Sequence, residues 1–356
     1  MGLVIGIPKE QRANEYRVGM TPAGVSILAA QGHQCYVESK AGMGSGFTDV
    51  EFEQAGARIA YNTEEIYRRA DLLLKVQRPT EREIEWVRDG QILLCMWMVG
   101  TVRAAVLEAL QAKGVTAIAY ELIEEDDGHL PVLYPLSQVG GHMLGQIAAQ
   151  LLQNNHGGKG ILLGGAASVP PADVVIIGAG TVGMAAAESF VGMGARVILL
   201  DRNMRRLQAA HERLGNRITT MVSHGFNLRR VCAFADVLVG AVQVPGQRAP
   251  VIVTREMVRS MRPGSLIIDM SIDQGGCVET SRPTRHDQPT FIAENVIHYC
   301  VPNVPGVVAR TATHAFLNAA WPFIMLLAEH GLDAALAERP ALQRGLILRD
   351  GQRVTG

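Results

Sequence analysis

One stretch of the chain limits its possible folds more than any other. An apolar run, Val174–Ile177, enters a turn with glycines at its first, third and sixth positions, Gly178, Gly180 and Gly183, and a second apolar run ends at Asp201. This order is typical of a βαβ unit that binds a dinucleotide: a strand, a glycine-rich turn, a helix and a second strand that ends at an acidic residue. The alternative is a glycine-rich turn in another α/β fold.

Each part of this unit has a physical role. Gly178 permits the tight turn, Gly180 lets the backbone approach a pyrophosphate, and Gly183 lets the helix pack closely on its strand. Free N–H groups at the helix N-terminus attract the phosphates. Asp201 is placed to accept hydrogen bonds from the ribose hydroxyls and to repel a 2′-phosphate, which favours NAD over NADP. Arg202 weakens this preference because a basic residue beside the acid tolerates a phosphate.

Composition indicates an ordinary globular protein. The chain has 356 residues, enough for two domains, with 48% hydrophobic and 19% charged residues. A formal net charge of −1 argues against nucleic acid or an acidic membrane as a partner bound by bulk electrostatics. The apolar N-terminal run is too short for a signal peptide, and no run reaches the ~18 residues of a membrane span, so we expect a cytoplasmic protein. The five scattered cysteines predict reduced core thiols and no metal site.

Apolar runs alternate with helical segments along most of the chain, which predicts parallel sheets. The expected strands are 3–7, 34–38, 71–76, 91–96, 116–120, 174–177, 195–201, 237–242, 266–270 and 296–300, and the expected helices include 21–31, 102–113, 137–155 and 314–330. The last of these helices is too apolar to stand alone, so we expect it to return to the first domain. The predicted fold is α/β, with two Rossmann-like doubly wound domains and a cleft between them. Residues 1–136 and 307–356 form the substrate domain, and residues 137–306 form the NAD-binding domain.

Several motifs carry a resemblance that covers nearly the whole chain in register. They are Pro8-Lys9-Glu10, Asn14–Val18, Thr21–Val25, Ala41–Phe47, Gly158–Gly165, Gly240–Val242 with Pro245-Gly246, and Ile272–Gly276. Together they resemble the alanine dehydrogenase family, which is related to the α subunit of nicotinamide nucleotide transhydrogenase. The run Ile-Asp-Gln-Gly-Gly at Ile272–Gly276 favours the dehydrogenase branch.

The resemblance implies two Rossmann-like domains with the active site between them and a homo-oligomer, a dimer or a hexamer built from dimers. It also implies that Arg17 holds the substrate carboxylate, that Asp273 lies beside the nicotinamide, and that Asn303 belongs to the same site. The residues expected to contact NAD are Ser137, Gly178, Gly180, Thr181, Val182, Gly183, Asp201, Ser223, Val242 and Ile272.

Two catalytic positions depart from the family pattern. The family strand Lys-Val-Lys-Glu-Pro reads Lys75-Val76-Gln77-Arg78-Pro79 here, so Gln77 replaces the lysine that contacts the substrate. The family segment Tyr-Leu-His-Leu-Ala reads Met96-Trp97-Met98-Val99-Gly100, so Met98 replaces the histidine that acts as acid or base. Methionine cannot transfer a proton at any pH. Smaller departures place Gln138 and His142 where the family has glutamate and arginine.

These losses predict that plain L-alanine is not the substrate. A pocket lined by Met98 is more apolar than one with a histidine, and it suits a substrate bulkier than alanine. Trp97 either adds to this pocket or packs in the core. The leading hypothesis is hydride transfer between NAD(H) and a carbon bearing nitrogen, in an amino acid or imine other than alanine. One alternative is a catalytically silent NAD-binding sensor or scaffold, and another is a lyase or cyclodeaminase that uses bound NAD transiently.

Each proposed catalytic residue has a plainer interpretation. Asp273 could cap backbone donors in its glycine-rich turn, and Arg17 could form a surface ion pair with Glu15. Three histidines, His142, His298 and His314, could relocate the proton shuttle, although each is more often packed or exposed. If Asp273 and Arg17 are catalytic, we expect them on opposite walls of one cleft, because both must reach one small molecule.

Overall fold

The computed structural model describes residues 2–244 and 248–354, so the motif residues Pro245 and Gly246 lie outside the described part of the chain. The chain divides into two compact units. Unit 1 comprises Met1–Leu136 and Pro305–Gly356, and unit 2 comprises Ser137–Val304.

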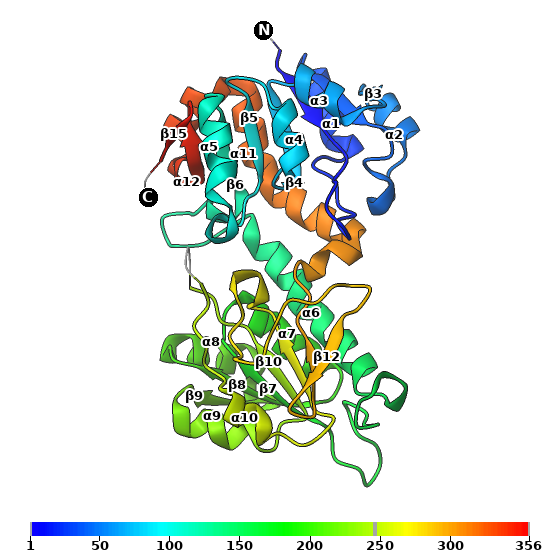
Figure 1. Cartoon of the computed structure of the whole chain (residues 1–356), viewed down its shortest axis with the longest axis vertical. Helices are drawn as coiled ribbons and strands as arrows, with labels where there is room; N and C mark the ends of the chain where they lie inside the picture. Colours follow the sequence, from blue (N-terminus) through cyan, green and yellow to red (C-terminus); the bar gives the residue numbers. More distant parts are fainter. Residues whose placement is uncertain (1, 245–247, 355–356) are drawn as a thin grey trace. The chain divides into compact units, whose positions relative to one another are not determined.

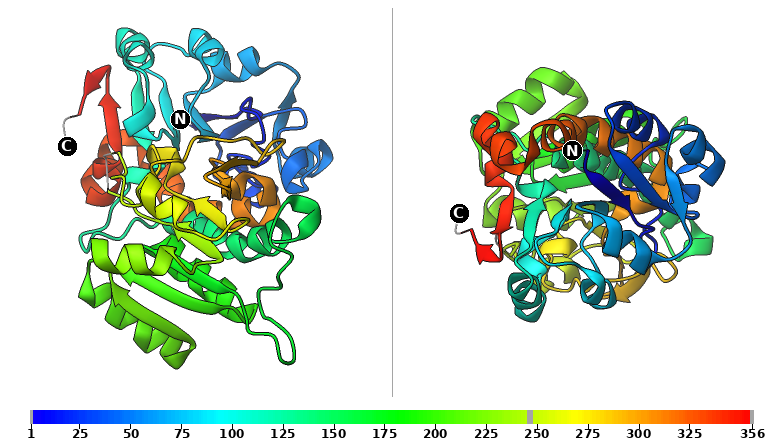
Figure 2. Two further views of the ribbon diagram at one scale, coloured as in Figure 1. Left: turned by 60° about the horizontal axis from the view of Figure 1, so that its bottom comes forward. Right: turned by 90° about the horizontal axis from the view of Figure 1, so that it is seen from above.

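The sheet of unit 1 has the strand order β15-β14-β6-β5-β4-β1-β2-β3 (Figure 1). Its strands β1 to β6 pair in parallel, while β14 and β15 add antiparallel strands at one edge, where Figure 2 shows them in red. The strands are β1 (Val4–Ile7), β2 (Gln34–Glu38), β3 (Arg58–Ala60), β4 (Leu72–Gln77), β5 (Ile92–Met96), β6 (Thr116–Ala119), β14 (Leu346–Arg349) and β15 (Gln352–Arg353).

The helices of unit 1 connect and cover these strands. They are α1 (Pro22–Ala30), α2 (Asp49–Gln54), α3 (Thr63–Arg69), α4 (Glu81–Trp86), α5 (Ala104–Ala112), α11 (Ala309–Glu338) and α12 (Pro340–Arg344). Two short helices begin at capping boxes, in which Thr48 pairs with Glu51 and Thr80 pairs with Glu83. Each box satisfies backbone N–H groups that the first turn leaves without partners, which helps these short helices to form.

Unit 2 contains a sheet with the order β12-β13-β11-β10-β7-β8-β9. All of its strands pair in parallel except β12, which is antiparallel to β13. The strands are β7 (Asp173–Ile177), β8 (Arg196–Asp201), β9 (Ile218–Val222), β10 (Val237–Gly240), β11 (Leu266–Asp269), β12 (Thr290–Ala293) and β13 (Val296–Tyr299). The helices are α6 (Leu133–Leu151), which begins in unit 1, α7 (Thr181–Gly192), α8 (Met204–Leu214), α9 (Gly225–Cys232) and α10 (Arg255–Arg259).

Both sheets reverse direction beside their first strand. In unit 1 the chain proceeds from β1 outward to β3 and then returns to β4 on the other side of β1; in unit 2 it returns to β10 on the other side of β7. The prediction of two Rossmann-like α/β domains is therefore confirmed. Ligands bind such sheets in the crevice at the carboxyl ends of the strands where the order reverses, so these two points are where functional residues are expected.

The long C-terminal helix α11 belongs to unit 1. By length and composition alone, the segment Val304–Glu338 could cross a membrane, and half of its most apolar window is buried. Within unit 1 it packs closely: the ring centroids of Tyr120 and Phe316 lie 4.8 Å apart, and the hydroxyls of Ser45 and Thr313 lie 2.8 Å apart. These contacts are those of a helix in the core of unit 1.

The structure also corrects details of the sequence analysis. Helix α6 begins at Leu133, not at residue 137, and ends at Leu151, where a 3-10 turn at Asn154–His156 follows. Five short strands were not expected: β3, β9, β12, β14 and β15. Each is at or next to a sheet edge, where a strand is half-exposed and lacks the continuous apolar run that marks a buried parallel strand. The five cysteines are all buried free thiols.

Candidate functional site

The turn after β7 is built for close approach of a ligand. Gly178 has φ +108°, and a Cβ there would collide with the carbonyl oxygen of Ala241; a Cβ on Gly183 would collide with the carbonyl oxygen of Gly178. Gly180 differs, because a Cβ on it would meet no atom within 4 Å. The fold itself therefore requires the first and third glycines, whereas the second leaves open the space that a pyrophosphate would occupy.

Helix α7 begins directly after this turn. Its N-cap residue, Gly180, supplies no side-chain hydrogen bond. The N–H groups of the first helical turn, which begins with Thr181, Val182 and Gly183, thus have no capping side chain and carry the positive end of the helix dipole. This arrangement suits a phosphate group.

Asp201 closes β8 beside the same turn. Its Oδ2 accepts the backbone N–H of Ala179 at 2.7 Å, and its Oδ1 accepts the N–H of Asn203 at 2.8 Å. Arg206 Nη1 lies 3.9 Å from Oδ2. The side chain is one-tenth exposed, so the carboxylate is fixed next to the glycine turn, the position from which an acid contacts a ribose.

The other residues predicted to contact NAD follow neighbouring strands of unit 2. Ser223 follows β9 and donates its N–H to the carbonyl of Asp201 at 2.9 Å; Val242 follows β10, and its N–H donates to Ser271 Oγ at 3.0 Å. Ile272 is buried in the turn after β11. Ser137 lies in α6, one turn before Gly141, and at Gly141 this helix packs so closely on α7 that a Cβ would meet the carbonyl oxygen of Val182. The parallel sheet thus brings the strand-end residues to one edge.

Two proposed catalytic residues of unit 2 meet. Asp273 lies in a 3-10 turn, Ile272–Gln274, directly after β11, and its Oδ2 is 3.5 Å from the backbone N–H of Asn303, a residue with φ +54°. A second acid, Asp269, caps backbone donors of the same turn. Asp269, which is buried, accepts the N–H groups of Ser271 and Cys277, both at 3.0 Å.

In unit 1, the carboxyl ends of β1 and β4 bring together Arg17, Glu15 and Gln77. Arg17 is 2% exposed and donates from Nε to Glu15 Oε1 at 2.7 Å and from Nη2 to Glu15 Oε2 at 2.5 Å. Gln77 donates from Nε2 to Glu15 Oε2 at 3.3 Å. The Arg17–Glu15 ion pair that the sequence offered as an alternative is present, but it is buried and not at the surface. A substrate carboxylate at Arg17 would share the guanidinium with Glu15.

Met98 occupies a clamped turn after β5. Its backbone is left-handed, with φ +52°, and its N–H donates to Glu121 Oε1 at 2.5 Å, while the N–H of Trp97 donates to Glu121 Oε2 at 3.0 Å. From the other side, Arg78 Nη1 donates to the carbonyl of Trp97 at 2.6 Å. Burial raises the pKa of Glu121. Trp97 is fully buried, and its indole N–H donates to the carbonyl of Ile118, so it is a core residue and does not line a pocket.

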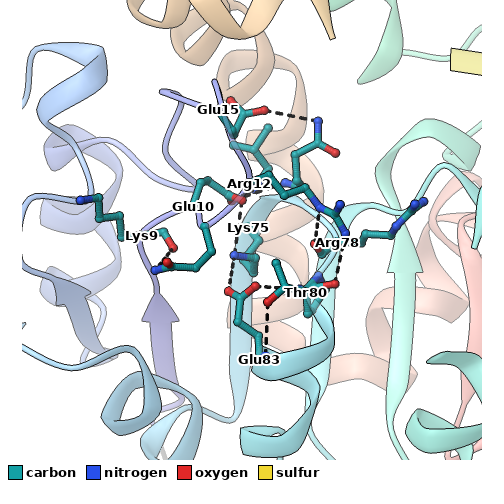
Figure 3. A network of polar contacts seen from close by, with 12 residues as sticks. Lys9, Glu10, Arg12, Glu15, Lys75, Arg78, Thr80 and Glu83 are labelled. Atoms are coloured by element: carbon teal, nitrogen blue, oxygen red, sulfur yellow. Dashed lines mark hydrogen bonds and ion pairs between the residues drawn. The ribbon is translucent and has the colours of Figure 1, made fainter. Parts of the chain in front are cut away.

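Beneath this edge lies a buried charged network (Figure 3). Lys75 Nζ is 2.8 Å from Glu83 Oε1 and 3.3 Å from Glu10 Oε2. Glu10 Oε1 accepts the N–H of Val76 at 2.7 Å and that of Gln77 at 3.4 Å. Burial raises the pKa of Glu10 to about 7, although Lys75 acts against this rise. Glu10 therefore holds the end of β4 that presents Gln77.

The three histidines considered as proton shuttles lie in ordinary surroundings. His298 is fully buried, with Nε2 2.7 Å from Thr280 Oγ1 and Nδ1 2.9 Å from the carbonyl of Val296, and burial lowers its pKa. His142 is half-exposed, with Nε2 3.9 Å from Glu188. His314 is exposed and contacts the Phe47 ring. Among residues 2–244 and 248–354, no cluster of His, Cys, Asp or Glu could hold a metal ion.

The sequence analysis missed several residues of these sites: Arg12, Arg78, Glu10, Glu121 and Asp269. For Arg78 a signal was present, since the resemblance already implied that an arginine stands here in place of a glutamate. For Asp269 the signal was an acid inside an apolar strand shortly before two glycines. The partners of Arg12, Glu10 and Glu121 are backbone groups or residues distant in sequence, which no local pattern reveals.

Comparison with known proteins decides the family. Residues 6–140 match the model of the alanine dehydrogenase/PNT N-terminal domain, and residues 145–356 match that of the C-terminal domain. The chain belongs to the alanine dehydrogenase/PNT family. It is 45% identical over 351 residues to an alanine dehydrogenase of Methanococcus maripaludis, covering 98% of this chain and 94% of that protein.

Solved structures of the alanine dehydrogenase/PNT family have the same fold as this chain. An L-alanine dehydrogenase superposes with a TM-score of 0.94 at 41% identity, covering 99% of this chain and 97% of that one. A transhydrogenase from Sinorhizobium meliloti gives 0.84 at 25% identity, covering 99% and 100%. The chain is thus an oxidoreductase of the alanine dehydrogenase family, and NAD(H) is its cofactor. The open space at Gly180, the uncapped α7 and the position of Asp201 fit that cofactor.

Proposed function

We propose that the chain transfers a hydride between NAD(H) and a carbon bearing nitrogen in an amino acid or imine other than alanine. The observation that supports this proposal is the pair Gln77 and Met98. The neutral amide of Gln77, at the end of β4, contacts Glu15. The thioether of Met98 belongs to the turn after β5, the strand next to β4. Neither side chain carries a positive charge or transfers a proton.

The chemistry explains why the two residues matter. Reducing a ketone requires a group that polarises the carbonyl oxygen and protonates it, and losing a positioned acid or base costs ~10²–10⁴ in rate. An imine nitrogen takes up its proton more readily, so its reduction depends less on such a group. In the oxidative direction, the C–H bond breaks with its electron pair, the nitrogen loses a proton, and a C=N bond forms. Bound NAD⁺ supplies the hydride acceptor.

Asp273 and Arg17 have separate tasks in this reaction. Asp273 accepts or returns the proton on nitrogen, and the N–H of Asn303 holds its Oδ2 in place. Arg17 holds the substrate carboxylate, with its guanidinium oriented by the two hydrogen bonds to Glu15. The proposal requires that both residues reach one substrate, although they belong to different units.

The experiment is to follow NADH absorbance and fluorescence with a panel of amino acids and of amine–keto acid mixtures that form imines. We expect turnover with at least one substrate and none, or very little, with L-alanine. Alanine turning over faster than every other compound would refute the non-alanine substrate. Tight NAD binding with no turnover on the panel would favour a silent sensor or scaffold, and consumption of substrate without net NADH would favour a lyase or cyclodeaminase.

Two further properties are proposed, the first from the family resemblance and the second from the sequence analysis. We infer a homo-oligomer, a dimer or a hexamer, and a cytoplasmic location. Light scattering of the purified protein tests the oligomer, and a monomer at working concentration would contradict it.

A further inference from the structure

Two arginines lie together at the point where the sheet of unit 1 reverses. Arg12 follows β1 and Arg78 follows β4, and these two strands are neighbours. Figure 3 shows the two side by side, with Glu15 on one side of them and Glu83 on the other. The crevice at the carboxyl ends of such a strand pair is where α/β sheets bind ligands.

Both guanidiniums are held by uncharged acceptors. Arg12 donates from Nε to the carbonyl of Arg78 at 3.2 Å and from Nη2 to that of Pro79 at 3.4 Å. Arg78 donates from Nη1 to the carbonyl of Trp97 at 2.6 Å and to Thr101 Oγ1 at 2.9 Å. Both residues are only partly exposed.

The nearby carboxylates have other partners. Glu15 binds Arg17, Glu81 binds Arg103, and Glu121 accepts the backbone N–H groups of Trp97 and Met98. Glu121 attracts Arg78 through space, but among residues 2–244 and 248–354 neither Arg12 nor Arg78 forms an ion pair with a carboxylate.

Two partly buried like charges without a counter-ion are costly. Burial and the neighbouring Arg12 both lower the pKa of Arg78. An anion placed between the two guanidiniums would remove this repulsion and form charge-assisted hydrogen bonds. Arg17 differs, because it already forms an ion pair with Glu15, and a substrate carboxylate would share its guanidinium with that residue.

We propose that Arg12 and Arg78 bind a second carboxylate of the substrate, so that the substrate is an amino acid or imine with two carboxylates. The first carboxylate contacts Arg17, as in the proposed function, on which this inference rests. The replacement of the family lysine by the neutral Gln77 is consistent with it, since the positive charge at this edge comes from Arg12 and Arg78 instead.

The test compares acids with their amides, which have nearly the same shape. The NADH-bound protein, in which an amino acid cannot be oxidised, is titrated calorimetrically with glutamate and glutamine, and with aspartate and asparagine. We expect at least one acid to bind about 10- to 100-fold more tightly than its amide, the range of one or two charge-assisted hydrogen bonds. Equal binding of acid and amide in both pairs would refute the second carboxylate site.

Variants then assign the effect to the two arginines. Arg12→Gln should remove most of the preference for the acid, because it weakens binding of the acid much more than binding of the amide. Arg78→Lys, which keeps the charge, should retain part of the preference. The control is Arg68→Gln, an exposed arginine of α3 paired with Glu64, which should change neither affinity.

These outcomes separate a binding role from a structural one. Arg78 also holds the Met98 turn, so a purely structural role predicts that Arg12→Gln and Arg78→Lys weaken acid and amide equally, which would overturn the proposal. The result is also independent of the redox reaction. If the acid preference is found but no compound yields NADH, the proposed function fails and the dicarboxylate site stands; if NADH forms only with monocarboxylates, the site fails and the function stands.

Discussion

Asp201 Oδ2 accepts the N–H of Ala179 at 2.7 Å, which ties the acid at the end of β8 to the glycine turn at the end of β7. The carboxylate therefore stabilises the turn and also lies where an acid of this unit would contact a ribose. Replacing Asp201 therefore affects both the stability of the turn and the preference between NADH and NADPH, and two different substitutions are needed to distinguish these effects.

Changing Asp201 to alanine should narrow the preference for NADH over NADPH by about 1–2 kcal/mol, the scale of hydrogen bonds to a charged acceptor. Asp201→Asn is the matched control, because the amide oxygen can still accept the N–H of Ala179 while the negative charge is removed. Calorimetric affinities for both nucleotides measure the effect. Wild-type protein that binds NADPH as tightly as NADH would contradict the assigned role of Asp201.

The glycines of the turn should respond differently to substitution. Gly180→Ala places its Cβ in open space, so the variant should fold with little loss of stability yet bind NADH at least ~10-fold more weakly, because the methyl group occupies the pyrophosphate space. Gly183→Ala places its Cβ against the carbonyl of Gly178 and should lower the stability itself. Thermal unfolding and NADH titration of both variants check this, and the reverse pattern would show that Gly180 has a structural task.

Restoring the family residues should change the substrate. The double variant Gln77→Lys, Met98→His regains a positive charge near Arg17 and a proton-transferring side chain, and we expect it to reduce pyruvate with ammonia faster than the wild type. The gain should be well below the ~10²–10⁴ of a fully positioned acid or base, because Arg78 and Glu121 hold the turn in its present form. Wild-type turnover on L-alanine within the usual ~1–10³ s⁻¹ would contradict the premise.

The arrangement of unit 2 could be predicted because its signals are local. The turn from Gly178 to Gly183 and the terminal Asp201 lie within one βαβ unit, where spacing in sequence determines position in space. The clamp on Met98 could not be predicted in this way. Arg78 and Glu121 reach that turn from two other strand ends, and their partners are backbone atoms that any residue supplies.

The burial and the partners of charged residues were equally hard to infer from the sequence. The alternative of an Arg17–Glu15 pair placed that pair at the surface, whereas it is buried. Burial depends on how the loop after β1 folds over the sheet, not on the separation of the two residues in sequence. In the same way, Asp269 and Asp273 are both acids near one turn, and only the structure shows that Asp269 caps it.

Arg17 and Asp273 should give distinct kinetic defects. Arg17→Ala should raise KM for the substrate and spare NADH affinity, although the loss of the guanidinium that neutralises Glu15 adds a stability cost that thermal unfolding reports. Asp273→Asn should lower kcat more than it raises KM, because the amide keeps the shape and loses the proton-transfer group. Steady-state kinetics on the substrate found by the panel measures both, and an Asp273→Asn variant with unchanged kcat would exclude Asp273 as the acid or base.

Glu10 should make stability depend on pH near neutrality. Its pKa is raised by burial from 4.5 to about 7, so the folded state holds this proton more tightly than the unfolded state does. The resulting stability is fully present below pH 4.5 and is lost as the pH rises through about 7. Relative to wild type, Glu10→Gln should therefore become more stable between pH 5 and pH 8 by about 1–3 kcal/mol, because a tenfold change in proton affinity corresponds to ~1.4 kcal/mol.

The control for Glu10→Gln is Glu51→Gln. The hydrogen bonds from the backbone N–H and the hydroxyl of Thr48 lower the pKa of Glu51. The stability that Glu51 contributes is therefore lost only when the pH falls through this lowered pKa. From pH 5 to pH 8 the stability of Glu51→Gln should change with pH as that of the wild type does. Denaturant midpoints at intervals across this range measure all three proteins. If the stability of Glu10→Gln instead changes with pH in parallel with that of the wild type, Glu10 stays ionised from pH 5 to pH 8. In that case the attraction of Lys75 outweighs the effect of burial on Glu10.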